Sequence, residues 1–214
     1  MGLYDRFILP PIVHHVCSRS SAMRQRAKIV PAAAGRVLEI GFGSGLNLPY
    51  YDPATVTHLW ALDPSERMWD LARENVRRAP FPVEFVNARA EELPLENHSA
   101  DTILLTYTLC TVREVPSALR EIQRVLEPGG VLLFCEHGAA PDETTRRWQR
   151  RLNAGWTRLS GGCNLTRPIP ALLEEGGFRI RELSAMYVPG WRPASFNYWG
   201  SAVPAGQDRF TTIS

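Results

Sequence analysis

The sequence predicts an α/β fold built on a doubly wound, mainly parallel sheet with helices on both faces. Short apolar runs alternate with helical segments from Arg36 to Glu136, which is the pattern of successive strand–helix–strand units. A glycine-rich turn follows the first apolar run, and an acidic residue follows the second. In such a sheet this arrangement builds a nucleotide site at the carboxyl ends of the strands.

The strands of the first half are expected where apolar runs end at glycine, proline or acidic residues. Their ranges are 36–41, 57–63, 82–87 and 100–106, with a short helix within 43–50. A helix is expected from Ser65 to about Ala79, because Ser65 is a residue type favoured as an N-cap. Its apolar face at helical spacing consists of Met68, Leu71, Ala72 and Val76.

The second half continues with a helix over 116–126, which begins with a proline and ends before Pro128-Gly129-Gly130. A strand over 131–136 and a long, arginine-rich helix over 141–160 follow. The remaining expected elements are a loop, a short helix and two strands, over 161–168, 169–176, 178–188 and 197–203.

Residues 1–34 form a preface of expected helices, broken at Pro10-Pro11 and closed by Pro31. The sequence shows no secretory signal and no apolar run of about 18 residues that could span a bilayer. The apolar segment Phe7–Val16 is too short to cross a membrane. Peripheral contact with a membrane surface stays open.

Composition narrows the function classes. A chain of 214 residues with 44% hydrophobic residues is long enough for one domain with its own core. A net charge of +2 without a basic block gives no case for a nucleic-acid partner. The cysteines are widely separated and form no C-x-x-C pair, so we expect no metal site, no disulfide framework and a reducing, cytoplasmic location.

The glycine-rich turn carries the most specific chemistry. Glu39, Gly41, Gly43 and Gly45 form an E-x-G-x-G-x-G pattern in place of the G-x-G-x-x-G of dinucleotide sites. This spacing favours S-adenosylmethionine, which has no pyrophosphate. Asp63, after the second strand, is expected to accept hydrogen bonds from the ribose hydroxyls. The alternative for Asp63 is an acid at a helix N-terminus.

These motifs, with Arg89-Ala90-Glu91-x-Leu93-Pro94 and Leu126-Glu127-Pro128-Gly129-Gly130, resemble the class I S-adenosylmethionine-dependent methyltransferases over about residues 35–205. The resemblance implies a Rossmann-like sheet of seven strands in the order 3-2-1-4-5-7-6 with strand 7 antiparallel. It also implies a methyltransferase domain over 35–214 and a helical lid over 1–34. The implied cofactor contacts are Glu39, Gly41, Gly43, Gly45, Asp63, Pro64, Ala90, Glu91, Thr106 and Tyr107. Arg89 stands where many relatives have an aspartate for the adenine amino group.

A narrower resemblance concerns the methyl acceptor. Leu109-Cys110-Thr111-Val112, Glu136-His137 and Gly162–Arg167 are similar to the alkyl-thiol methyltransferases of the methyltransferase-like group. A small thiol or sulfide is therefore the expected acceptor, with His137 and Cys110 as catalytic candidates. The substrate candidates are Tyr4, Cys110, His137, Asn164 and Arg167.

Other interpretations stay open. His137 can instead fix a local loop, Cys110 can be a small core hydrophobe, and Asn164 and Arg167 can tie a loop down. The reaction can instead be N-, O- or C-methylation of a phospholipid head group or quinone-like molecule. A cofactor-binding regulator without chemistry is the alternative outside enzymes. The sequence leaves monomer and homodimer open.

Overall fold

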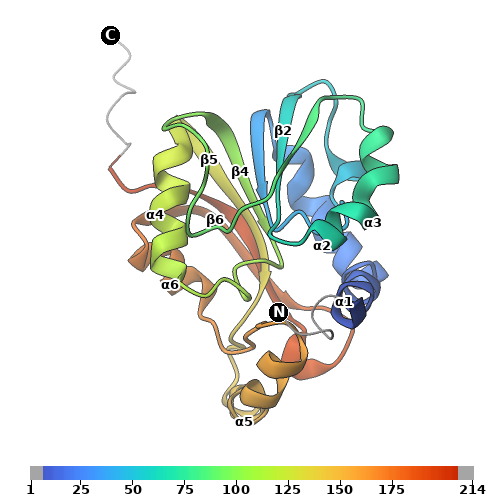
Figure 1. Ribbon diagram of the computed structural model, residues 1–214. Helices are drawn as coiled ribbons and strands as arrows, with labels where there is room; N and C mark the ends of the chain where they lie inside the picture. The colour runs from blue at the N-terminus through green and yellow to red at the C-terminus, as the bar shows by residue number, and fades with distance from the viewer. Residues whose placement is uncertain (1–6, 207–214) are drawn as a thin grey trace.

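The computed structural model describes residues 7–206. A seven-stranded sheet in the order β3-β2-β1-β4-β5-β7-β6 runs through the molecule (Figure 1). Strands β1 to β5 are parallel, and β7 is antiparallel to both β5 and β6. The expected strand order and reversed seventh strand are confirmed. The strands are β1 Gly35–Ile40, β2 Val56–Leu62, β3 Val83–Val86, β4 Ala100–Thr106, β5 Leu126–His137, β6 Phe178–Tyr187 and β7 Phe196–Pro204.

Helices cover both faces of the sheet. They are α1 Leu9–Cys17, α2 Ser20–Ile29, α3 Glu66–Arg77, α4 Val115–Val125, α5 Glu143–Leu159 and α6 Ile169–Glu175. Short 3-10 helices span Val30–Ala32, Leu48–Tyr50 and Arg192–Ala194. Ser65 caps α3 as expected, because its side chain accepts a hydrogen bond from the amide of Met68.

The apolar runs of the strands supply two cores, one on each face, because successive strand side chains point to opposite sides. On one face Leu38 and Ile40 pack in a cluster with residues of α4 and α6, such as Leu119 and Leu173. On the other face Val37 packs in a cluster that includes residues of α2, α3 and the 3-10 helix Leu48–Tyr50. The central strands β1, β4 and β5 are therefore largely buried on both sides, and the polar groups that a ligand can reach lie at the strand ends.

Two expected boundaries were wrong. Pro10 and Pro11 do not break a helix but lie in the first turn of α1, where the backbone amides have no intrahelical acceptor to lose. Strand β5 begins at Leu126, before the expected Val131. A register irregularity between β4 and β5 accommodates the glycines that precede Val131 and keeps the chain in the sheet.

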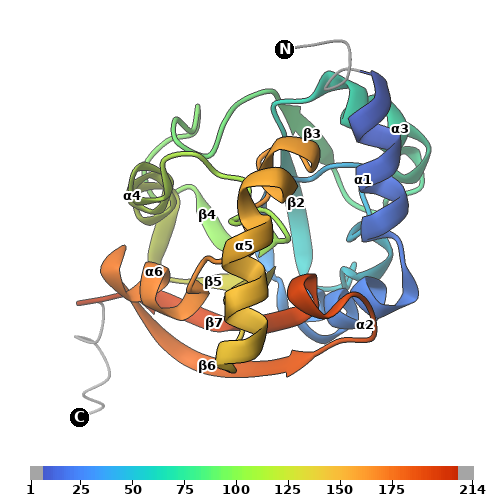
Figure 2. The same ribbon diagram turned by 90° about the horizontal axis from the view of Figure 1, so that it is seen from below.

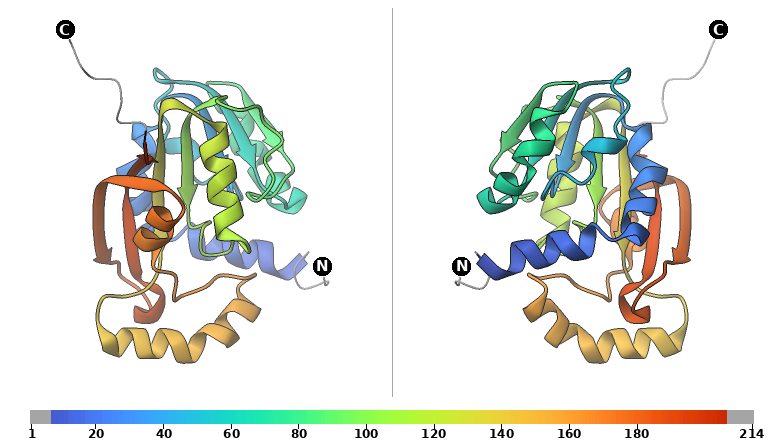
Figure 3. Two further views of the ribbon diagram at one scale, coloured as in Figure 1. Left: turned by 90° about the vertical axis from the view of Figure 1, so that its left-hand side faces the viewer. Right: turned by 90° about the vertical axis from the view of Figure 1, so that its right-hand side faces the viewer.

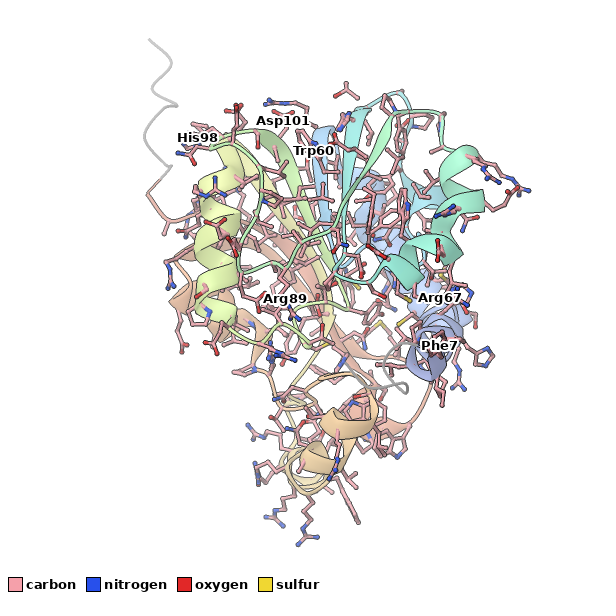
Figure 4. All side chains as sticks on the ribbon, viewed as in Figure 1. Phe7, Trp60, Arg67, Arg89, His98 and Asp101 are labelled. Carbon is pink, nitrogen blue, oxygen red and sulfur yellow. The ribbon has the colours of Figure 1, made fainter. Side chains whose placement is uncertain are left out.

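The carboxyl ends of the parallel strands point to the lower edge of Figure 1, where α1 and α5 lie. Seen from below, α5 crosses this edge while α1 lies beside α3 (Figure 2). The side views show α5 as a separate layer beneath the strands (Figure 3). Arg89 lies toward this lower end of the molecule, and His98 and Asp101 lie at the opposite end (Figure 4). Functional side chains are thus expected between the strand ends, α1 and α5.

Within residues 7–206, no helix has both the length and the hydropathy that crossing a bilayer requires.

Candidate active site

A cavity of about 1390 Å³ lies at the carboxyl ends of β1, β2, β4 and β5. Its walls come from α1, α2, the glycine-rich loop, the turn after β4, the end of α5 and the loop before α6. Ligand pockets usually measure about 300–1,000 Å³. The cavity therefore has room for a nucleoside-sized cofactor and a second small molecule.

The glycine-rich loop requires glycine for two reasons, its backbone conformation and its close contact with a neighbouring segment. Gly41, Gly43 and Gly45 have φ values of +75°, +58° and +73°, in the left-handed region where other residues are strained. In addition, a Cβ on Gly41 would collide with the side chain of Thr108. All three glycines are thus required by conformation, and Gly41 also by its close approach to the turn after β4. Gly41 and Gly43 line the cavity.

Asp63 is buried where β2 ends and faces the same cavity. Its two carboxylate oxygens accept hydrogen bonds from the amides of Gly43 and Ser65, each at 2.8 Å. Burial raises the pKa of Asp63, and these two amide bonds oppose that rise. Asp63 thus holds the glycine loop and the start of α3 together, and the remaining lone pairs of its oxygens are available to a ligand. Both interpretations of Asp63 find support in this geometry.

Glu39 lies behind the glycine loop and does not line the cavity, although it was expected among the cofactor contacts. Its carboxylate accepts hydrogen bonds from the Asn47 amide at 2.8 Å and the Tyr51 hydroxyl at 2.6 Å. Burial raises the pKa of Glu39 to about 7. In the described protein Glu39 fixes the segment that follows the glycine loop.

Arg26 of α2 is a cavity residue that the sequence analysis missed. Its Nη1 donates to Asn47 Oδ1 at 2.8 Å and to Thr106 Oγ1 at 2.7 Å. The guanidinium carbon lies 5.2 Å from the centre of the Tyr107 ring. Arg26 is 5% exposed, and no carboxylate is paired with it among the described ion pairs. A buried positive charge beside a ligand cavity points to an anionic ligand group. No local sequence signal marked this arginine.

The remaining expected cofactor residues differ in what they offer. Ala90, Thr106, Tyr107 and Pro64 line the cavity. Tyr107 has a φ of +56°, and its hydroxyl donates to Asn197 at 2.7 Å, which fixes the turn that closes over the cavity.

Glu91 also lines the cavity, but its carboxylate is engaged elsewhere. It accepts hydrogen bonds from the amides of Arg113 and Glu114 at 3.0 and 3.2 Å. Glu91 therefore secures the chain just before α4.

One end of the cavity contains a cluster of two thiols and an imidazole, Cys110, His137 and Cys163. The Nε2 atom of His137 lies 2.9 Å from the sulfur of Cys163, and the indole of Trp156 donates to the same sulfur at 3.2 Å. All three cluster residues are buried and line the cavity. The structure thus brings His137 and Cys110 together, as expected, and adds Cys163 of the Gly162–Arg167 segment, for which the sequence predicted no role.

Hydrogen bonds control the ionisation of this cluster. The bond from Cys110, with those from His137 and Trp156, outweighs burial and lowers the pKa of Cys163. Burial lowers the pKa of His137, but the bond to Cys163 and the negative charges of Cys163 and Glu136 together outweigh burial and raise that pKa. The His137 Nδ1 atom is buried without a hydrogen-bond partner among the described residues. The hydrogen bond between the two side chains therefore couples the ionisation of Cys163 to that of His137.

Asn164 and Arg167 line the cavity, but their polar groups are used within the protein. The Asn164 side chain accepts hydrogen bonds from the amide and the hydroxyl of Thr166 at 2.9 and 2.8 Å. Arg167 donates to the carbonyls of Leu109 and Val112. These contacts match the alternative in which both residues tie loops down.

The helix α1 contacts the glycine loop through a bond that the sequence did not indicate. His14 Nδ1 lies 2.6 Å from the hydroxyl of Ser44. Residues of α1 and α2 line one side of the cavity. Tyr4, a substrate candidate, lies outside the described residues.

Comparisons with known proteins identify the family. A family model described as "Methyltransferase domain" matches residues 38–134. The chain is 32% identical over 179 residues to the thiol S-methyltransferase TMT1A of Homo sapiens, covering 81% of this chain and 72% of that relative.

The names of other relatives give methyl acceptors that are not thiols. The demethylmenaquinone methyltransferase of Clavibacter sepedonicus is 34% identical over 119 residues, which cover 56% of this chain and 48% of that one. The phosphatidylethanolamine N-methyltransferase of Cereibacter sphaeroides is 34% identical over 121 residues, with coverages of 56% and 59%.

Solved structures share the fold. One, a possible histamine N-methyltransferase of Thermotoga maritima, superposes with a TM-score of 0.62 at 22% identity, covering 93% of this chain and 96% of that chain. From its fold, its glycine loop and its similarity to curated methyltransferases, the chain belongs to the class I S-adenosylmethionine-dependent methyltransferases.

Proposed function

We propose that this methyltransferase moves the methyl group of S-adenosylmethionine to the sulfur of a small thiol. The observation that carries the proposal is the buried cluster of Cys110, His137 and Cys163 at one end of the cavity. Similarity to TMT1A across 81% of the chain supports a thiol acceptor.

The cofactor is proposed to occupy the half of the cavity that the glycine loop and Asp63 line. There Asp63 would accept hydrogen bonds from the ribose hydroxyls, and the amide of Ala90 would donate to the adenine ring. The positive charge of Arg26 would attract the carboxylate of the methionine moiety. Thr106 and Tyr107 would border the methyl-bearing side. Glu39 would support this site through Asn47 rather than touch the cofactor.

Residues 7–34 are proposed to act as part of the lid over the cofactor. Both α1 and α2 line the cavity, and His14 attaches α1 to the glycine loop at Ser44. Closing a site in this way excludes water from the transferring methyl group.

Methyl transfer is an in-line displacement, so the protein must align the acceptor sulfur with the sulfonium. A free thiol has a pKa of about 8.5 and is partly ionised near neutral pH. His137 lies beside the proposed acceptor position, and its neutral imidazole can take the thiol's proton. An alcohol would need a much stronger base, and no such group lines this end of the cavity among the described residues.

A lipophilic acceptor, such as a quinone or a phospholipid head group, is the second candidate. It is favoured by the exposed apolar residues Ile8, Ile12 and Val16 of the α1 region, which are 52%, 48% and 47% exposed. Their helical spacing puts them on one face, which suits peripheral contact with a lipid surface. The relatives that act on menaquinone precursors and phosphatidylethanolamine support this alternative.

A cytoplasmic location is proposed because the cysteines form no disulfide bonds. All four are free thiols, which suits a reducing compartment. Monomer and homodimer are both compatible with the described surface.

The purified protein with methyl-labelled cofactor should be offered thiols, amines, phenols, quinols and phosphatidylethanolamine vesicles. Label in thioether products supports the proposal. Label only in quinol or phospholipid products would replace it with the second candidate.

A further inference from the structure

Cys110, His137 and Cys163 come from three segments of the chain: the turn after β4, the end of β5 and the loop between α5 and α6. Their possible ligand atoms all lie within 4.8 Å of one another. Two sulfurs and an imidazole nitrogen are donors that zinc prefers. Three protein ligands with one open position are the usual arrangement of a catalytic zinc site.

We propose that Cys110, His137 and Cys163 bind a zinc ion whose open position, on the cavity side, takes the sulfur of the acceptor thiol. Zinc binding stands on the cluster itself, and the role of the open position rests on the proposed function. The proposal departs from the expectation of no metal site, which considered only the distances between cysteines along the sequence.

The cluster needs little adjustment to hold the metal. Zinc–sulfur and zinc–nitrogen bonds of about 2.3 and 2.0–2.1 Å in a tetrahedral site separate sulfur and nitrogen by roughly 3.5 Å. The His137 Nε2 and Cys163 Sγ atoms are 2.9 Å apart. An opening of this pair by about 0.6 Å therefore satisfies the zinc–ligand distances, and zinc replaces the hydrogen bond between the two groups.

The surroundings hold the ligands in place. The amide of Asn164 donates to the carbonyl of Cys110 at 3.0 Å, which joins the segments that carry the two thiols. Trp156 donates to the Cys163 sulfur at 3.2 Å, a bond that a zinc-bound thiolate retains. Such outer hydrogen bonds orient metal ligands and tune their basicity.

The open position explains how a thiol is activated. On binding, the acceptor loses its S–H proton to solvent, and its thiolate sulfur coordinates zinc. That sulfur attacks the sulfonium methyl: a new carbon–sulfur bond forms, and the old one breaks with its electron pair left on the cofactor sulfur. The neutral thioether product is a weaker ligand than a thiolate, so it leaves.

The test begins with the wild-type chain, purified under reducing conditions, stripped by a chelator and titrated with zinc and then cobalt. One equivalent of zinc, and a cobalt form with thiolate-to-metal charge-transfer absorption, support the site. Absence of stoichiometric zinc binding overturns it. Neither measurement requires a variant to fold.

Variants then show where the zinc ion binds. Cys163→Ala should weaken zinc binding by at least the roughly 10–100-fold that loss of an outer-shell partner costs. Cys135→Ala is the matched control, because Cys135 is also a buried free thiol but does not line the cavity. Equal zinc affinity in the two variants overturns the assignment of Cys163 as a zinc ligand, provided that circular dichroism shows both variants to be folded.

The open position is tested with 2-mercaptoethanol added to the cobalt form. Stronger charge-transfer absorption supports coordination of the acceptor sulfur, and an unchanged spectrum overturns that role. Undiminished thiol methylation by zinc-free protein also overturns the metal's role while the proposed function stands. Conversely, one equivalent of zinc bound at the cluster without methylation of any thiol supports the site and removes the proposed function.

Discussion

His137 Nε2 and the sulfur of Cys163 lie 2.9 Å apart, although they belong to the end of β5 and to the loop between α5 and α6. This contact joins the parallel sheet to the layer formed by α5. Both residues line the cavity, so we expect a change in either one to alter this end of the cavity and to leave the glycine loop and Asp63 in place.

We expect His137→Ala to reduce kcat/KM for a thiol on the order of 100-fold, because it removes the proposed general base or, in the zinc-bound protein, a metal ligand. Cofactor affinity should change much less, because His137 lies away from Asp63 and the glycine loop. Steady-state kinetics and calorimetry measure the two effects. His98→Asn is the control, since His98 lies at the opposite end of the molecule (Figure 4). Equal losses in turnover and cofactor affinity would contradict the placement of His137.

Asp63→Ala should weaken S-adenosylmethionine binding by roughly 1.5–3 kcal/mol, the range for hydrogen bonds to a charged group. The substitution removes the proposed ribose acceptor and also frees the amide of Gly43. Isothermal titration calorimetry measures the effect. Asp70→Ala, on the exposed side of α3, should bind the cofactor normally. Unchanged affinity in a folded Asp63→Ala protein would mean that the ribose is held elsewhere.

Arg26→Gln should weaken binding of S-adenosylhomocysteine but leave 5′-methylthioadenosine almost unaffected. The two ligands share the nucleoside, and only the first carries the amino-acid carboxylate that Arg26 is proposed to attract. The expected loss is about 1.5–3 kcal/mol for a hydrogen bond between charged groups. Parallel losses for both ligands would assign Arg26 a purely structural role through Asn47 and Thr106.

Much of the fold was predictable because its signals are local. Val37 to Ile40 form a buried apolar strand, and Gly41 and Asp63 follow two strand ends, where nucleotides bind in such sheets. The reversed β7 followed only from the family resemblance. Pro10-Pro11 was misinterpreted because a proline pair can either begin or end a helix.

The cluster of Cys110, His137 and Cys163 was harder to predict from the sequence, since it depends on contacts between distant segments. No pattern near Cys163 shows that Asn164 pairs with the backbone of Cys110. Likewise, Arg26 becomes a cavity residue only because α2 packs against the sheet. Glu91 matches a motif, yet its carboxylate holds the chain before α4. The roles assigned to the site residues stay predictions.

Burial raises the pKa of Glu39 to about 7, above its usual value of about 4.3. Between these values the folded protein holds a proton that the unfolded chain releases, so Glu39 lowers the free energy of unfolding as pH rises through this window. Glu39→Gln should become more stable relative to wild type from pH 4.5 to 7, by at most about 3 kcal/mol. Urea unfolding of the cofactor-free proteins measures this difference. A difference that does not change with pH would place the Glu39 pKa near its usual value.

Sulfur is the proposed acceptor atom. The most direct test is kcat/KM for three acceptors with one carbon skeleton that differ only in a thiol, a hydroxyl or an amine. We expect a preference of at least about 100-fold for the thiol, since the site supplies no strong base for the alcohol. Equal rates for the three acceptors, or methylation of the amine or alcohol alone, would contradict it.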